Sequence, residues 1–133
     1  MGVRIGILSP LDSEPSNEDL ERLDTCLWQV YSDYRQHNSD FGITIAARDH
    51  LGLHAANRLF AYNWHIGVVV EEDHGNPLEH YSVEWVVEKE HLIYYGIIHA
   101  SNVLIVSHKL HRNTTLQQRI TMLSHDGVKV YRM

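Results

Sequence analysis

The sequence predicts an α/β fold, namely a single doubly wound, Rossmann-like domain with a five-stranded parallel sheet and helices on both faces. Short apolar runs rich in β-branched residues recur along the chain, as in strands. Between them lie longer segments whose apolar residues are three and four positions apart, which is the helical spacing. The runs are continuous and not alternating, and this is typical of parallel strands buried on both faces.

The strands are expected at 3–9, 41–47, 65–72, 102–107 and 128–133. Three consecutive valines at 68–70 make the third of these the most strand-like segment of the chain. Crossovers between parallel strands are short and right-handed, which leaves few topologies. We expect the strand order 3-2-1-4-5, with two helices on each face.

The helices are expected at 17–36, 53–63, most of 82–100, and 114–126. Ser16 and Asp19 have the spacing of a capping box at the start of the first helix. Asn113 or Thr114 is suited to cap the last helix, and Gly127 is a suitable residue just beyond its end. Every predicted helix therefore connects two predicted strands.

Composition limits the classes of function. The 133 residues are 44% hydrophobic, which fits one packed domain spanning 1–133. A formal charge of −6 without a lysine- or arginine-rich stripe argues against binding of duplex nucleic acid. No apolar run approaches the roughly 18–20 residues that cross a bilayer, so no membrane association is expected. Cys26 is the single cysteine, and a chain without an internal disulfide suits the cytoplasm.

A ligand is expected beyond the carboxyl ends of the strands, where the strand order reverses. Three loops there precede helix N-termini, whose free amides and dipole suit a phosphate or another anion. Asn and Thr also cap helices routinely, and from the loop before the last helix alone, capping is the simpler interpretation. The loops supply these candidate ligand-binding residues: Ser9, Pro10, Arg48, Asp49, Gly52, Arg112, Asn113, Thr114 and Thr115.

Several stretches resemble the SLOG superfamily of nucleotide-binding proteins, which includes DprA and the LOG phosphoribohydrolases. "GLHAANRLFAYNWHIGVVV" resembles the family's "GAD…A…G…V" part, "ASNVLIVS" its "AD-x-LIV", "TTLQQR" the LOG "GTLEE", and "HDGVKVYRM" the usual "G-k-x-V" ending. The resemblance spans nearly the whole chain through individually degenerate motifs. It implies nucleotide binding, places His54 in the pocket where the family has Asp, matches Thr115 to Thr, and adds Tyr94 to the site.

The departures from this pattern concern catalysis more than binding. Ser9-Pro10 lacks the family's glycine, and Ile93-Tyr94 stands where the family has a basic pair. Gln117 and Gln118 replace acidic residues of the LOG enzymes, and an amide cannot act as a general acid or base. LOG-type hydrolysis is therefore not expected, whereas a phosphate site made of backbone amides and hydroxyls would survive.

The sequence leads to three functional hypotheses. The first is a module that senses or sequesters a nucleotide or nucleotide-derived small molecule at the carboxyl edge of the sheet. Such a module needs no cofactor, and a homodimer is compatible with it. The second is a hydrolase or transferase of N-glycosidic bonds, similar to the LOG enzymes or the nucleoside deoxyribosyltransferases. The third is a partner-binding protein with a vestigial pocket.

Two histidine pairs and one group of carboxylates are further candidates for a functional site. His50 and His54 lie four residues apart, as do metal ligands on one helix face, and Asp49 and Asp73 are candidates to join them. His108 and His111 form a similar pair. No HExxH motif or Cys/His cluster accompanies them, so no metal is expected. The carboxylates of a predicted outer helix face beside Lys89 are interpreted as solvated; they are Glu84, Glu88 and Glu90.

Overall fold

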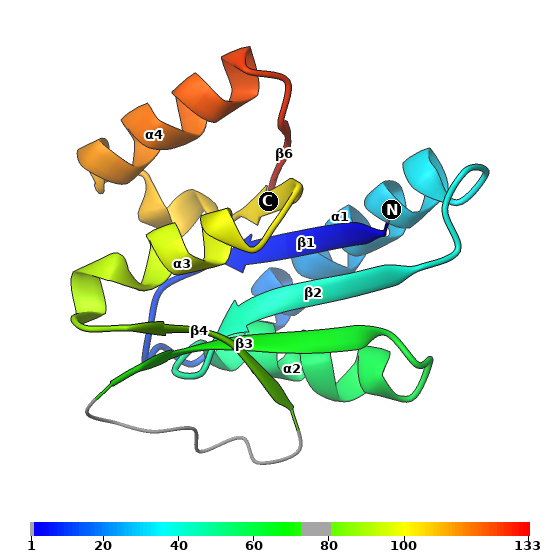
Figure 1. The fold of residues 1–133 in the computed structure, drawn as a ribbon, viewed down its shortest axis with the longest axis horizontal. Helices are drawn as coiled ribbons and strands as arrows, with labels where there is room; N and C mark the ends of the chain where they lie inside the picture. The colour runs from blue at the N-terminus through cyan, green and yellow to red at the C-terminus, as the bar shows by residue number, and fades with distance from the viewer. Residues whose placement is uncertain (1, 73–80) are drawn as a thin grey trace.

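The computed structural model, which describes residues 2–72 and 81–133, contains a parallel sheet of six strands in the order β4-β3-β2-β1-β5-β6 (Figure 1). Every neighbouring pair is parallel. The predicted α/β, Rossmann-like class is confirmed. The strands are β1 (Val3–Leu8), β2 (Phe41–Ala46), β3 (His65–Glu71), β4 (Ser82–Val87), β5 (Val103–Val106) and β6 (Lys129–Arg132).

Two helices cover each face of the sheet, as predicted (Figure 1). The four are α1 (Asn17–Tyr34), α2 (His50–Phe60), α3 (Ile93–His99) and α4 (Thr114–His125), with short 3-10 turns η1 (Glu90–Leu92) and η2 (His108–Leu110). Side chains of α1 and α2 pack with one side of the strands into one core cluster. Side chains of α3 and α4 pack with the other side into a second cluster.

The central strands are buried on both faces because both clusters use them. Along β2, Ile43 and Ile45 are fully buried under α1 and α2, whereas Ala46 belongs to the opposite cluster. Along β1, Ile5 and Ile7 face the first cluster and Leu8 faces the second. Alternation of side chains along each strand thus divides a continuous apolar run between two cores, which explains the unbroken hydrophobic stretches of the sequence.

The prediction of five strands was wrong by one, and the error lies in the segment 82–100. Ser82–Val87 forms the edge strand β4, and only Ile93–His99 is α-helical. Val83 and Val86, expected on a buried helix side, are 45% and 55% exposed. This stretch consists largely of valine and tryptophan, which favour strands, and its helix-like spacing is coincidental. The described order extends the predicted 3-2-1-4-5 by this one strand.

The helix ends follow the predicted local chemistry. Ser16 and Asp19 form both halves of the capping box at α1. Asn113 caps α4, and Gly127 follows it with a φ of +96°, a conformation that glycine adopts readily. Helix α2 begins at His50, earlier than expected, because Asp49 is its N-cap.

Candidate functional site

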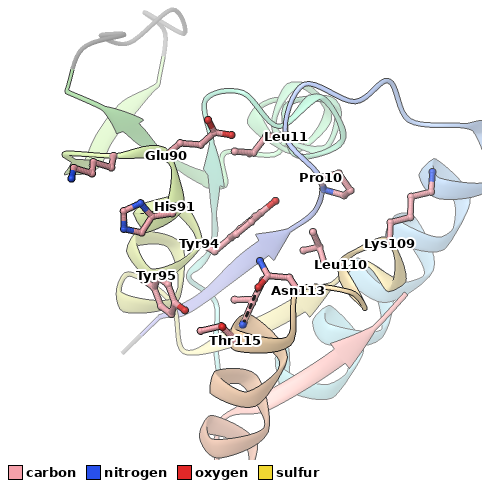
Figure 2. Close-up of a pocket in the computed structure, with 12 residues that line it drawn as sticks. Pro10, Leu11, Glu90, His91, Tyr94, Tyr95, Lys109, Leu110, Asn113 and Thr115 are labelled. Atoms are coloured by element: carbon pink, nitrogen blue, oxygen red, sulfur yellow. Dashed lines mark hydrogen bonds between the residues drawn. The ribbon is translucent and has the colours of Figure 1, made fainter.

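A pocket of about 910 Å³ opens at the carboxyl edge of the sheet (Figure 2). Its walls come from the loop after β1, from η1 with the start of α3, and from η2 with the start of α4. Strand β1 lies between β2 and β5, so the connections on either side of it lead to opposite faces of the sheet. The pocket therefore lies at the switch point of the strand order, where ligands of doubly wound folds bind.

The first turn of α4 borders this pocket with free amides. The Asn113 side chain accepts a hydrogen bond from the Leu116 amide at 3.2 Å, and its backbone oxygen accepts one from the Gln117 amide. Within the described residues no hydrogen bond is found for the amides of Thr114 and Thr115. The cap is neutral and Thr115 lines the pocket. Free amides and the positive helix end favour an anion there.

Lys109 is among the pocket residues, but its side chain points away from this helix end (Figure 2). Lys109 Nζ lies 2.6 Å from the Asp19 carboxylate, which is buried at the start of α1. The hydrogen bond from Lys109 lowers the pKa of Asp19 below its ordinary value, despite the burial. The pair holds the ammonium group at the start of α1, and Asp19 offsets its charge.

Tyr94 forms the wall that faces the α4 terminus (Figure 2). Its hydroxyl donates a hydrogen bond to the Ser9 backbone oxygen at 2.8 Å, which ties α3 to the loop after β1. Burial, with a contribution from the charge of Asp49, raises the pKa of Tyr94 to about 12. The ring is therefore a neutral, fixed surface against which a flat group can stack.

Arg48 lies beside the pocket, but its guanidinium is occupied by carboxylates. It contacts Asp12, lies 2.5 Å from Glu71 and lies 3.4 Å from Glu90. These acidic partners raise its pKa above the ordinary value. The residue predicted to bind a ligand thus joins the loop after β1, the end of β3 and η1. Its charge is largely neutralised before any ligand arrives.

Asp49 is buried against the same region and serves its own helix. One carboxylate oxygen accepts the Gly52 amide at 3.0 Å. The other oxygen and the Ser9 hydroxyl have no hydrogen-bond partner among the described residues, although the hydroxyl is near enough to oppose the rise in the pKa of Asp49. Burial dominates and raises this pKa to about 6. The anion position at the start of α2 is therefore filled by the protein's own side chain.

Gly52 and His54 lie away from the pocket. A Cβ added to Gly52 would lie 2.9 Å from Ile45 Cγ2, so this glycine allows α2 to pack closely on β2. Its predicted role in admitting a ligand to the backbone stays a prediction. His54 is exposed on α2 and is not among the residues that line the pocket, because α2 covers the opposite face of the sheet.

The structure thus separates the predicted site residues into two groups. The residues that line the pocket are Pro10, Tyr94, Asn113 and Thr115. A hydrogen bond from Tyr94 connects Ser9 to the pocket wall. The exposed Arg112 and Thr114 are adjacent in sequence to Asn113. The start of α2 carries the other predicted residues, which are Arg48, Asp49, Gly52 and His54. Sequence reasoning missed the pocket residues Leu11, Lys89, His91, Tyr95, Lys109, Leu110 and Leu116.

Two interpretations of acidic and amide side chains change with the structure. Glu90 was expected on a solvated outer helix face; its side chain is 60% exposed, but it lies in η1 and lines the pocket. Glu84 lies in β4 against His65. Gln117 donates to the Leu110 backbone oxygen and accepts from Arg132, each at 3.1 Å, so it supports the turn before α4.

Neither a metal centre nor a membrane span is found in the part of the chain that the structure describes. No group of three or more potential metal ligands is present there, and none of its helices has the length and apolarity to cross a bilayer. Asp73, weighed as a companion of the histidine pair, lies outside the described residues. Comparison of the chain with family models, curated proteins and solved structures finds no match.

Proposed function

We propose that this protein binds a nucleotide or nucleotide-derived small molecule in the pocket at the carboxyl edge, as a sensor or sequestering module. The observation that carries the proposal is the first turn of α4, whose amides at Thr114 and Thr115 lack partners among the described residues and lie next to a pocket at the switch point. Such a terminus suits a phosphate group without further basic residues.

The pocket offers distinct surfaces for the two ends of such a ligand. The phosphate would lie against the α4 terminus, where the Thr115 hydroxyl adds a donor. The base and sugar would extend along Pro10 and Tyr94, which supply apolar and aromatic surface (Figure 2). The volume of about 910 Å³ falls within the roughly 300–1,000 Å³ of typical small-molecule sites.

Glutamines at the two positions aligned with the LOG catalytic acids favour binding without turnover. Gln117 is engaged by Leu110 and Arg132, and Gln118 is exposed. An amide in a structural hydrogen bond supplies no proton and stabilises no developing positive charge. The resemblance to the SLOG superfamily remains part of this proposal.

A thermal-shift screen of nucleotides and their matching nucleosides tests the proposal. A ligand that binds only the folded protein stabilises it by about 2.7 kcal/mol at 100 times its Kd. At least one phosphorylated compound should raise the melting temperature well above the shift caused by its nucleoside. A flat response to the whole panel would favour a protein-binding role with a vestigial pocket.

A second candidate, cleavage or exchange of an N-glycosidic bond, is favoured by one observation. The Glu90 carboxylate lines the pocket and lies 3.4 Å from Arg48, so it is placed to act as a nucleophile or base. Incubation of the nucleotide panel with the protein, followed by mass spectrometry, distinguishes the two functions. Release of free base by the parent chain, abolished in Glu90→Gln, would replace binding with catalysis.

A further inference from the structure

The pocket at the carboxyl edge has two ends with opposite hydrogen-bonding character. Among the described residues, Glu90 at the start of η1 supplies the only carboxylate of the pocket wall. Figure 2 shows Glu90 beside Leu11 on one side of Tyr94, with Asn113 and Thr115 on the other side. The end at the α4 terminus therefore offers amide donors, whereas the end at Glu90 offers an acceptor.

The Glu90 carboxylate is held in position without being fully satisfied. Its Oε2 lies 3.4 Å from a nitrogen of Arg48, and no partner is found for its Oε1 among the residues that the structure describes. Arg48 also contacts Asp12 and lies 2.5 Å from Glu71. Because one guanidinium is shared among three carboxylates, Glu90, at the longest distance, is the least neutralised of them. An ionised carboxylate only accepts hydrogen bonds, so this end of the pocket favours donor groups.

The other ionisable side chains at this end of the pocket leave the acceptor open. Lys89 and His91 flank Glu90 in the sequence, line the pocket and are exposed. Within the described part of the chain, neither forms an ion pair with Glu90. Figure 2 shows the His91 ring directed away from the Glu90 carboxylate. The acceptor is thus available to a molecule in the pocket.

We propose that Glu90 selects nucleotides whose base carries an exocyclic amino group, as adenine and cytosine do. This inference rests on the proposed nucleotide binding and identifies the class of base within the same site. In a nucleoside monophosphate the base is the part farthest from the phosphate. With the phosphate at the α4 terminus and the base stacked on Tyr94, the edge of the base extends toward Glu90. The carboxylate then accepts a hydrogen bond from the amino group, as acidic side chains do from cytosine.

Bases with a carbonyl group in place of the amino group are disfavoured at this position. Hypoxanthine and uracil present an oxygen there, and two acceptors facing each other form no hydrogen bond. The loss of a hydrogen bond to a charged group weakens binding by about tenfold or more. Because the Glu90 side chain is exposed, water moderates the loss, and we expect a preference of about tenfold.

Calorimetric titration with two matched pairs of nucleotides tests this selection. The pairs are adenosine and inosine monophosphate, and cytidine and uridine monophosphate. The parent chain should bind the amino member about tenfold more tightly than the carbonyl member. Glu90→Gln presents both a donor and an acceptor, so it should bring the ratio of affinities close to one. Glu88→Gln is the matched control, because Glu88 is exposed and does not line the pocket, and it should keep the ratio of the parent.

The outcomes separate this inference from the function on which it rests. Equal affinities within each pair that binds the parent, or an unchanged preference in Glu90→Gln, would overturn the role of Glu90 and leave nucleotide binding standing. The same loss of preference in Glu88→Gln would also overturn it, since the effect would then follow from net charge. Absence of binding by all four nucleotides would overturn the proposed function and this inference together.

Discussion

The N-termini of α2 and α4 look alike in the sequence, but the structure uses them differently. Each follows a buried strand at the carboxyl edge, and each is capped by a side chain at the preceding residue. At α2 the cap is Asp49, a buried carboxyl group that occupies the anion position itself. At α4 the cap is the neutral Asn113, and Thr115 of the first turn lines a pocket. We therefore expect only the second terminus to receive an anion from outside.

The basic side chains near the two termini do not account for this difference. Beside α2, Arg48 is already held by Asp12, Glu71 and Glu90. Near α4, Lys109 is likewise held by Asp19 and points away from the terminus. The comparison teaches that a strand–loop–helix junction is only a potential anion site. The charge of its own cap decides whether the site is open.

The largest expected effect concerns the closed terminus at α2. Burial raises the pKa of Asp49 from 3.8 to about 6, so the folded chain holds this proton more tightly than the unfolded chain. Its stabilising contribution is complete below the unfolded pKa and is lost as the pH rises through the folded pKa. The loss approaches roughly 3 kcal/mol above that range.

Asp49→Asn keeps an acceptor for the Gly52 amide but removes the titration. The free energy of unfolding of the parent should therefore fall, relative to that of Asp49→Asn, between about pH 4 and about pH 7. Urea denaturation across this range measures the difference. Parallel pH profiles for the two proteins would show that Asp49 does not titrate as a buried group.

The next effect concerns the open terminus at α4. Replacing Thr114 and Thr115 together with valine preserves side-chain shape and removes two hydroxyls. A hydrogen bond to a charged group contributes about 1.5–3 kcal/mol, so nucleotide affinity should fall about tenfold or more. Affinity for the matching nucleoside should stay as in the parent. Calorimetric titration of both proteins measures this, and equal losses for the two ligands would mean that the threonines contact no phosphate.

A smaller effect is expected for Gly52→Ala, which tests the packing role assigned to this glycine. The new Cβ would crowd Ile45 in the core, and overpacking costs about 1–3 kcal/mol. Higher helix propensity returns up to about 1 kcal/mol. The melting temperature should decrease while nucleotide affinity remains unchanged. A clear loss of affinity in a folded variant would restore α2 as a ligand-binding terminus.

The smallest effect is expected for His54→Ala. The side chain is exposed on α2, and no contact of it with the pocket is found among the described residues. Stability should change by no more than about 0.5 kcal/mol, as for ordinary surface positions, and ligand affinity should not change. A strong decrease in affinity would show that the ligand reaches across to the α2 side.

Local chemistry made much of the fold predictable. The continuous apolar strands, the Ser16 capping box and the Asn113 cap all follow rules that operate within a few residues. The edge strand β4 was missed because valines at helical spacing satisfy two patterns at once. Only pairing with β3, which is a long-range contact, selects between them.

The candidate site was less predictable because it depends on contacts between distant segments. Lys109, which lines the pocket, pairs with Asp19, 90 residues away in the chain. Glu90 reaches it because a 3-10 turn replaces the expected helix. A sequence can indicate that residues end a strand or cap a helix. It does not show which cap carries a charge into the core and which leaves amides open.

The most direct test of the central claim is a nuclear magnetic resonance titration of the parent chain with a nucleoside monophosphate, following the backbone amides of both termini. The account predicts large, saturable shifts at Thr114 and Thr115, and small shifts at Leu51 and Gly52, whose amides face the Asp49 carboxyl group. Shifts concentrated at Leu51 and Gly52, or none at Thr114 and Thr115 on saturation, would contradict it.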